Sequence, residues 1–211
     1  MTTPLIKICG LTTPETVDAA VDAGATHIGL NLYEPSPRYV PVEQAALLRR
    51  RVPPEVKVVL LLVNQQPLPT AQAIDAVKPD VVQFHGLESP EWLALLKQHT
   101  RLELWKAWGL KNRESLESGL KFVGAADRIL YDAPAGALPG GNGLKLDWTL
   151  LDGFRHQLPW GLAGGLSPEN VAEAIRQTGA PLVDTSSGVE TAPGVKDPGR
   201  IRAFVQAARG A

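Results

Sequence analysis

The sequence of 211 residues predicts a single-domain (β/α)8 barrel. Short runs of β-branched and aliphatic residues alternate with amphipathic helical patterns along the whole chain. Most of these runs are almost continuously apolar, which is typical of parallel strands buried on both faces. The length suits one barrel, and no linker or shift in composition divides the chain, so we expect residues 1–211 to form one domain. An open, doubly wound parallel sheet is the alternative that this alternation leaves open.

Eight segments have the composition of buried strands. The first, Leu5–Cys9, is a short apolar run that Gly10 interrupts before a helical pattern begins. Turn residues separate the others from the helical patterns that follow them. The predicted strands are Leu5–Cys9, His27–Leu32, Val56–Leu62, Val81–Phe84, Leu102–Ala107, Ile129–Asp132, Gly161–Ala163 and Leu182–Thr185.

Six amphipathic patterns between these strands predict helices. Thr13 and Ser167 each precede a proline, which places a capping residue directly before the first helical position. Gly24 and Gly179 follow two of the patterns, as glycines at helix C-termini do. The predicted helices are Pro14–Ala23, Val42–Arg50, Thr70–Val77, Glu91–His99, Pro168–Thr178 and Asp197–Ala208.

Two further segments have weaker helical patterns. Arg113–Lys121 is a poor or short helix, and Trp148–Phe154 is brief. The proline-rich patches at Pro53–Pro54 and Pro67–Pro69 lie between elements and are predicted to be turns. Eight strands with six firm and two weak helices favour the barrel over the doubly wound sheet.

The composition excludes several classes of protein. A net charge of −1 leaves no basic excess for a nucleic acid or an anionic membrane surface. The longest apolar stretch, Val58–Val63, is too short to span a bilayer, and the N-terminus lacks the layout of a signal peptide. The single cysteine excludes an intrachain disulfide and fits a reducing cytoplasm. The four histidines are scattered and give no metal-ligand spacing.

Functional groups of a (β/α)8 barrel gather where the strands end and the βα loops begin. Applied to the predicted strands, this rule selects a small set of polar and glycine-rich positions. They are Cys9, the Asn31–Val40 loop, His85, Asp132, Gly164–Gly165 and Ser186–Gly188.

Two glycine-containing turns follow the last two predicted strands and predict a phosphate site. Gly164-Gly165 follows the seventh strand, and Ser186-Ser187-Gly188 follows the eighth. Glycines let backbone N–H groups approach an anion, and serine hydroxyls add donors. Tight turns without a ligand would explain either stretch alone, but phosphate-binding barrels use this pair of loops. The Pro139–Gly143 stretch after the sixth strand is expected to close over the ligand.

Cys9 and Asp132 are candidates for a base and an acid. Each ends a predicted strand, so the two side chains are expected to flank one pocket in the barrel mouth. Each also has a plainer explanation. A free cysteine usually just packs in the core, and an aspartate at a strand end often caps a helix or loop.

Eight short motifs that match a known enzyme family occur in order over almost the whole chain. They are Lys7–Leu11, Tyr33–Val40, Val82–Gly86, Tyr131–Ala133, Gly140–Gly143, Ala163–Val171, Asp184–Glu190 and Pro193–Asp197. The Ser-Pro-Arg-Tyr-Val and Ser-Ser-Gly-Val-Glu pieces are highly specific together. With these motifs the chain resembles the phosphoribosylanthranilate isomerase family of tryptophan biosynthesis.

The resemblance implies an aldose–ketose isomerase that needs no cofactor or metal. Its reaction is the Amadori rearrangement of N-(5-phosphoribosyl)anthranilate to 1-(2-carboxyphenylamino)-1-deoxyribulose 5-phosphate. By position, Asp132 is implied to be the general acid that opens the furanose ring, and Cys9 the general base that removes the proton from sugar C2. The acid must begin protonated, which burial would favour, and the base must reach the thiolate form.

The resemblance also implies how the substrate is held. Arg38 is implied to contact the anthranilate carboxylate. Its planar guanidinium group suits this role because it can donate two parallel hydrogen bonds to a carboxylate. His85 and Asp184 are expected to line or support the pocket. The full set of implied substrate-binding residues is Arg38, His85, Asp184, Gly141, Gly143, Gly164, Gly165, Ser186, Ser187 and Gly188.

The implied partner is a small phosphorylated substrate, with no nucleic acid and no membrane. Members of the family occur as monomers, dimers and fused domains, so we expect a monomer or a homodimer in the cytoplasm.

Three other functions compete with this one. The histidine-pathway isomerase performs the same chemistry but has an aspartate as its strand-one base, where this chain has Cys9. Indole-glycerol-phosphate synthase relies on lysines at strand ends, and Lys7 and Lys106 lie close enough to such ends to leave it open. A non-catalytic barrel that binds a phosphorylated metabolite would keep the glycine-rich loops but would need neither Cys9 nor Asp132.

Overall fold

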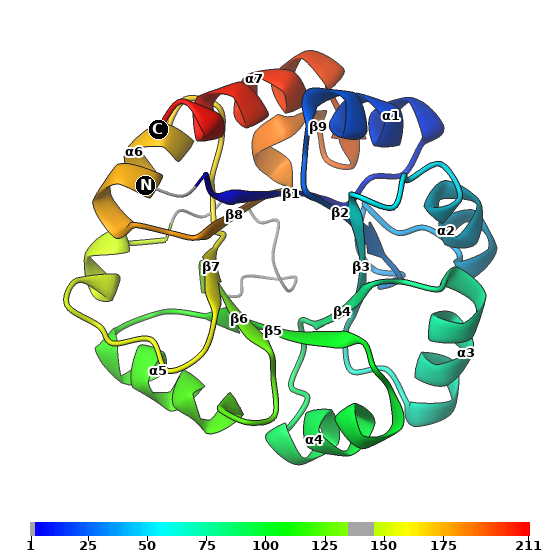
Figure 1. Cartoon of the computed structure of the whole chain (residues 1–211), viewed down its shortest axis with the longest axis horizontal. Coiled ribbons are helices and arrows are strands. Elements are labelled where there is room, and N and C mark those ends of the chain that lie inside the picture. The colour runs from blue at the N-terminus through cyan, green and yellow to red at the C-terminus, as the bar shows by residue number, and fades with distance from the viewer. Residues whose placement is uncertain (1–2, 135–145) are drawn as a thin grey trace.

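Eight parallel strands close into a barrel in the computed structural model, which describes residues 3–134 and 146–211. Neighbouring strands follow chain order, and β8 pairs with β1 to close the ring (Figure 1). This closure confirms the predicted (β/α)8 barrel and excludes the open doubly wound sheet. The strands are β1 (Leu5–Cys9), β2 (His27–Asn31), β3 (Lys57–Leu62), β4 (Val81–Phe84), β5 (Glu103–Gly109), β6 (Arg128–Asp132), β7 (Trp160–Leu162) and β8 (Leu182–Thr185).

Helices surround the barrel as an outer ring (Figure 1). Thr13 begins α1 as predicted, because its side chain accepts the backbone N–H of Thr16 in a capping box. Gly24 ends α1 in the left-handed conformation with φ of 90°. The α-helices are α1 (Pro14–Ala23), α2 (Val42–Arg49), α3 (Pro67–Val77), α4 (Pro90–His99), α5 (Arg113–Ser118), α6 (Val171–Thr178) and α7 (Pro198–Arg209).

The proline patch at Pro67–Pro69 is not a separate turn, contrary to the prediction. It forms the first turn of α3, which begins three residues before the predicted Thr70. Proline fits there because the first N–H groups of a helix have no partner within the helix, so their loss costs nothing.

The predicted start of α6 is also wrong. Ser167 does not cap this helix. Asn170 occupies the capping position, and its side chain instead binds the N–H of Ser167 and the carbonyl of Gly165 at 2.8 and 3.0 Å. Residues 168–170 therefore form a turn, and α6 begins at Val171. This turn fixes the loop that follows β7.

The two weak helical patterns are short helices. Arg113–Ser118 forms α5, and the 3₁₀ helix η1 (Gly119–Phe122) continues it. Trp148–Leu151 forms only a 3₁₀ turn, η2. After β8, the 3₁₀ turn η3 (Ser187–Val189) leads into a two-stranded hairpin of β9 (Glu190–Ala192) and β10 (Val195–Lys196), which the sequence pattern did not predict.

A cluster of apolar side chains packs inside the barrel, and Trp105 within it is fully buried. This packing makes the barrel a solid support, so the ends of the strands hold side chains in fixed positions at the mouth. The interior cluster consists of Val59, Val81, Trp105, Leu130, Ala163 and Leu182.

Among the described residues, the helices are all too short or too polar to cross a membrane.

Candidate active site

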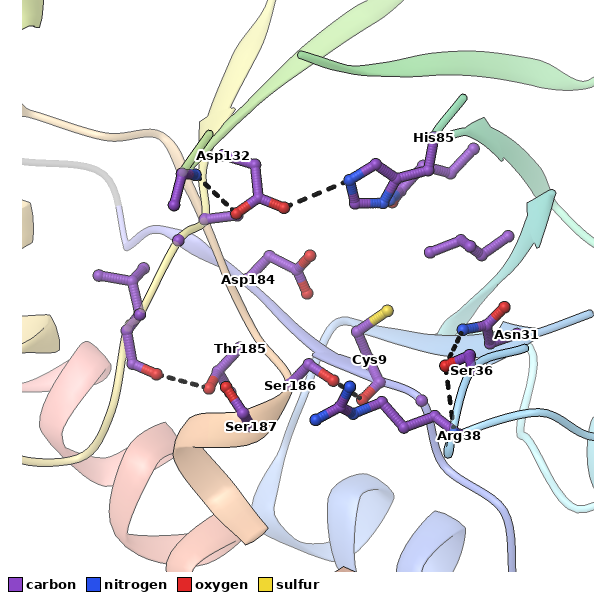
Figure 2. Close-up of a pocket in the computed structure, with 18 of the residues that line it drawn as sticks. Cys9, Asn31, Ser36, Arg38, His85, Asp132, Asp184, Thr185, Ser186 and Ser187 are labelled. Atoms are coloured by element: carbon purple, nitrogen blue, oxygen red, sulfur yellow. Dashed lines mark hydrogen bonds and ion pairs between the residues drawn. The ribbon is translucent and has the colours of Figure 1, made fainter. Parts of the chain in front are cut away.

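A cavity opens at the mouth of the barrel, where the strands end (Figure 2). The structure brings nine of the predicted site residues to its wall. Gly141 and Gly143, together with the Pro139–Gly143 loop, lie outside the described residues. Gly188 does not line the cavity. The nine are Cys9, Arg38, His85, Asp132, Gly164, Gly165, Asp184, Ser186 and Ser187.

Cys9 ends β1 and faces the cavity. Its register partner on β2 is Gly29, where an added Cβ would lie 2.8 Å from the Cys9 sulfur. A glycine is therefore required on β2 to leave room for this thiol. Burial raises the pKa of the Cys9 thiol; the ammonium groups of Lys7 and Lys196 oppose that rise, and the carboxylate of Asp184 adds to it.

Asp132 ends β6 on another side of the cavity from Cys9, with Asp184 drawn between them (Figure 2). One carboxylate oxygen of Asp132 accepts the backbone N–H of Ala133 at 2.8 Å. The other lies 3.4 Å from Nε2 of His85, which follows β4. The Asp132 carboxyl is thus oriented by the backbone on one side and by an imidazole on the other.

Asp184 on β8 lies opposite Lys7 on β1, and the two form a buried ion pair. The Lys7 ammonium donates to Oδ2 of Asp184 at 2.8 Å. The second oxygen, Oδ1, is buried and has no hydrogen-bond partner among the described residues. Burial raises the pKa of Asp184, although Lys7 opposes this. Asp184 lines the cavity.

Arg38 lies in the loop after β2 and makes a two-pronged contact with Glu190. Its Nε and Nη2 donate to the two carboxylate oxygens at 2.8 and 2.7 Å. Lys196 reaches the same carboxylate at 2.6 Å and also donates to the carbonyl and hydroxyl oxygens of Ser186. Burial raises the pKa of Glu190, but the Arg38 hydrogen bonds and the Lys196 ammonium hold it below its ordinary value.

These contacts give the β9–β10 hairpin a structural role at the cavity. Glu190 begins β9 and Lys196 ends β10, so the hairpin connects Arg38 to the Ser186 loop. Sequence reasoning missed this role for both residues, although each lies in a motif that carried the family resemblance. The available signal was a glutamate two residues after Gly188 and a lysine six positions further along the chain.

The two glycine-containing turns form the adjoining wall. Gly164 and Gly165 have φ of 82° and 73°, which side chains other than glycine rarely adopt. The Thr185 hydroxyl donates to the carbonyl of Leu166 at 2.7 Å and ties the two turns together. Gly188 has a structural reason to be glycine, because an added Cβ would collide with that same carbonyl.

Sequence reasoning missed Gln83 on β4. This side chain is almost fully buried and lines the cavity, and its Oε1 has no hydrogen-bond partner among the described residues. The signal was its inward position two residues before His85. Within residues 3–134 and 146–211, no cluster of histidine, cysteine or acidic side chains has the arrangement of a metal site.

Comparison with known proteins places this site in a family. A family profile described as N-(5'phosphoribosyl)anthranilate (PRA) isomerase matches residues 6–207. An N-(5'-phosphoribosyl)anthranilate isomerase from Erythrobacter litoralis is 59% identical over 207 residues, covering 98% of this chain and 99% of the relative. One from Cereibacter sphaeroides is 49% identical, covering 97% and 98%.

Solved structures of phosphoribosyl anthranilate isomerases also resemble this chain. The phosphoribosyl anthranilate isomerase of Thermotoga maritima is 34% identical, with a TM-score of 0.87 and coverage of 99% of this chain and 100% of that one. Another structure of such an isomerase, also 34% identical with a TM-score of 0.84 and the same coverage, holds reduced 1-(o-carboxyphenylamino)-1-deoxyribulose 5-phosphate. The chain therefore belongs to the N-(5'-phosphoribosyl)anthranilate isomerase family.

Proposed function

We propose that this protein isomerises N-(5-phosphoribosyl)anthranilate to 1-(2-carboxyphenylamino)-1-deoxyribulose 5-phosphate in tryptophan biosynthesis. The observation that carries the proposal is the position of Cys9 and Asp132 in one cavity whose wall includes Gly164–Gly165 and Ser186–Ser187. Family membership and the reduced product analogue held by a relative support the same substrate. A non-catalytic binder would have no need of an acid and a base placed in this way.

Asp132 acts first in the proposed reaction. Its carboxyl gives a proton to the furanose ring oxygen, the C1–O bond breaks, and the nitrogen lone pair forms a C1=N iminium. His85, 3.4 Å from the carboxylate, is placed to orient it. A positioned acid is effective here because the proton arrives at the oxygen as negative charge develops on it.

Cys9 acts second. Its thiolate removes the proton from sugar C2, and the electron pair forms the C1=C2 bond of an enolamine, which neutralises the iminium. The enol then loses its hydroxyl proton while C1 gains one, which yields the ketone. Because burial disfavours the thiolate, the positive iminium beside it supplies part of the stabilisation that the base needs.

The phosphate of the substrate is proposed to bind beside the turns after β7 and β8. Both turns line the cavity, with Gly164 and Gly165 in one and Ser186 and Ser187 in the other, and glycine-containing turns let backbone N–H groups approach an anion. Holding this end fixes the sugar carbons near Asp132 and Cys9.

We also propose that residues 1–211 work as one domain, in the cytoplasm, as a monomer or a homodimer. For Thermotoga maritima, both a dimeric isomerase and monomers generated from it have been described.

Arg38 is expected to contribute through binding of the anthranilate carboxylate. An Arg38→Ala variant should raise KM by about ten- to a hundredfold, the range for losing hydrogen bonds to a charged group, with a smaller change in kcat. Glu190 keeps Lys196 as a partner in this variant, so the hairpin keeps its anchor. Arg50→Ala, at an exposed position after α2, is the matched control and should leave KM unchanged. An unchanged KM in folded Arg38→Ala would count against the contact.

An inorganic anion should occupy the phosphate site. Crystals grown in sulfate or phosphate are expected to show the anion between Gly164–Gly165 and Ser186–Ser187. Inorganic phosphate should also inhibit competitively with the substrate, because both need the same N–H and hydroxyl donors. An empty site with the anion bound elsewhere in the barrel mouth would contradict this placement.

The activity itself is tested with freshly prepared N-(5-phosphoribosyl)anthranilate. Purified protein should remove the anthranilate-type fluorescence in proportion to protein concentration, without added metal or cofactor. A protein that binds the substrate but leaves the fluorescence at the uncatalysed rate would be the non-catalytic barrel, and the proposal would be wrong.

A further inference from the structure

Lys7 is a fully buried lysine that the reaction proposed above does not use. It lies on β1 with 0% of its surface exposed and does not line the cavity. Burying an ammonium group is unfavourable unless an anion faces it, so a lysine inside a barrel needs a partner and a reason to be there.

Lys7 lies on the same strand as the proposed base, one inward-facing position deeper in the barrel than Cys9. Lys7 and Cys9 are two residues apart on one strand, so both side chains project to the same, inward face of the barrel. The register of the sheet puts Lys7 opposite Asp184, and the ion pair at 2.8 Å fixes its ammonium there. The lysine is thus held by an anion on β8 while its charge acts on the thiol.

We propose that Lys7 is a positioning residue for catalysis, whose ammonium, anchored by Asp184, stabilises the thiolate of Cys9. The catalytic part of this inference rests on the proposed role of Cys9 as the base. Both the charge of Lys7 and its hydrogen bonding lower the pKa of the Cys9 thiol, against the effect of burial.

Other charged groups surround the thiol and set the sign of each expected change. Asp184 raises the thiol pKa, whereas Lys196 on β10 lowers it. Lys196 also donates to Glu190 and to Ser186, so much of its hydrogen bonding is already used in the hairpin. The groups around the thiol and its charged neighbours are Lys7 on β1, Asp184 on β8, Lys196 on β10, Asp132 on β6, His85 after β4, Arg38 after β2 and Glu190 on β9.

The test exploits Cys9 being the only cysteine in the chain. Carbamidomethylation by iodoacetamide, followed by intact mass, therefore reports on one thiol, and its rate against pH gives that thiol's pKa. Lys7→Met keeps the length of the side chain and removes the charge. It should shift the profile to higher pH and slow alkylation at pH 7 by about tenfold or more, since each pKa unit is tenfold in thiolate.

Two further variants make the result specific. Asp184→Asn frees the Lys7 ammonium from its carboxylate and should shift the profile in the opposite direction, to lower pH. Lys106→Met removes a second buried lysine, which is 3.3 Å from Glu88, and is the matched control for the loss of a buried cation. Its profile should coincide with that of the unaltered protein.

The inference is overturned if folded Lys7→Met alkylates with the unaltered profile, or if Lys106→Met shifts it as much. Should Lys7→Met fail to fold, the double variant Lys7→Met/Asp184→Asn decides, because it leaves neither buried charge without its partner. Its thiol pKa should lie above that of Asp184→Asn, and an equal or lower value overturns the inference. The base assignment fails separately, through an active Cys9→Ala variant, which leaves the alkylation result standing on its own.

Discussion

Cys9→Ala is expected to turn over about 10²–10⁴-fold more slowly than the unaltered protein, the usual contribution of a general base. An alanine cannot accept the proton from sugar C2, and no other cysteine is present to replace the thiol. The loss should fall on kcat, because Cys9 is proposed to act on the iminium and not to bind the ground state. Steady-state kinetics on the anthranilate fluorescence measure it.

Two controls accompany this variant. The reduced product analogue that a relative holds should bind Cys9→Ala as well as it binds the unaltered protein. Near-ultraviolet circular dichroism should also be unchanged, because removing a sulfur next to Gly29 leaves a small space and not a clash. Normal turnover by a folded Cys9→Ala variant would remove Cys9 from the mechanism.

Asp132→Asn is expected to lose a comparable share of turnover, about 10²–10⁴-fold. The amide keeps the size of the side chain and can still accept the N–H of Ala133, but it has no acidic proton for the ring oxygen. Alkylation of Cys9 should still proceed in this variant, which shows that the thiol is intact. Asp152→Asn, at an exposed position after η2, is the matched control and should retain the full rate.

The result that would contradict this assignment is a folded Asp132→Asn protein with near-normal turnover. Another group would then supply the proton, and His85, 3.4 Å from the Asp132 carboxylate, would be the first to substitute.

Much of the barrel could be predicted because its strands are continuous apolar runs. Leu5–Cys9, Val81–Phe84 and Leu182–Thr185 have the predicted bounds, and the cavity forms at their ends. The rule that functional groups follow barrel strands needs only those ends. It therefore found Cys9 and Asp132 without any knowledge of side-chain contacts.

What the sequence did not predict depends on contacts between distant residues. The Lys7–Asp184 pair joins positions 177 residues apart, and the Arg38–Glu190 pair joins positions 152 apart. Neither partner can be chosen from local pattern, since register across the closed barrel decides it. A lysine within an apolar strand was a visible anomaly, but its partner was not. The start of α3 was missed because prolines mark both turns and first helical turns.

The central claim is that Asp132 acts at the ring oxygen before Cys9 acts at C2, and a kinetic isotope effect tests this order most directly. Single-turnover rates are measured with substrate carrying hydrogen or deuterium at sugar C2. In Cys9→Ala, removal of the C2 proton should limit the rate, so deuterium should slow the reaction. In Asp132→Asn, ring opening should limit the rate, so the isotope effect should disappear. A full isotope effect in Asp132→Asn together with none in Cys9→Ala would contradict the assignment of the two roles.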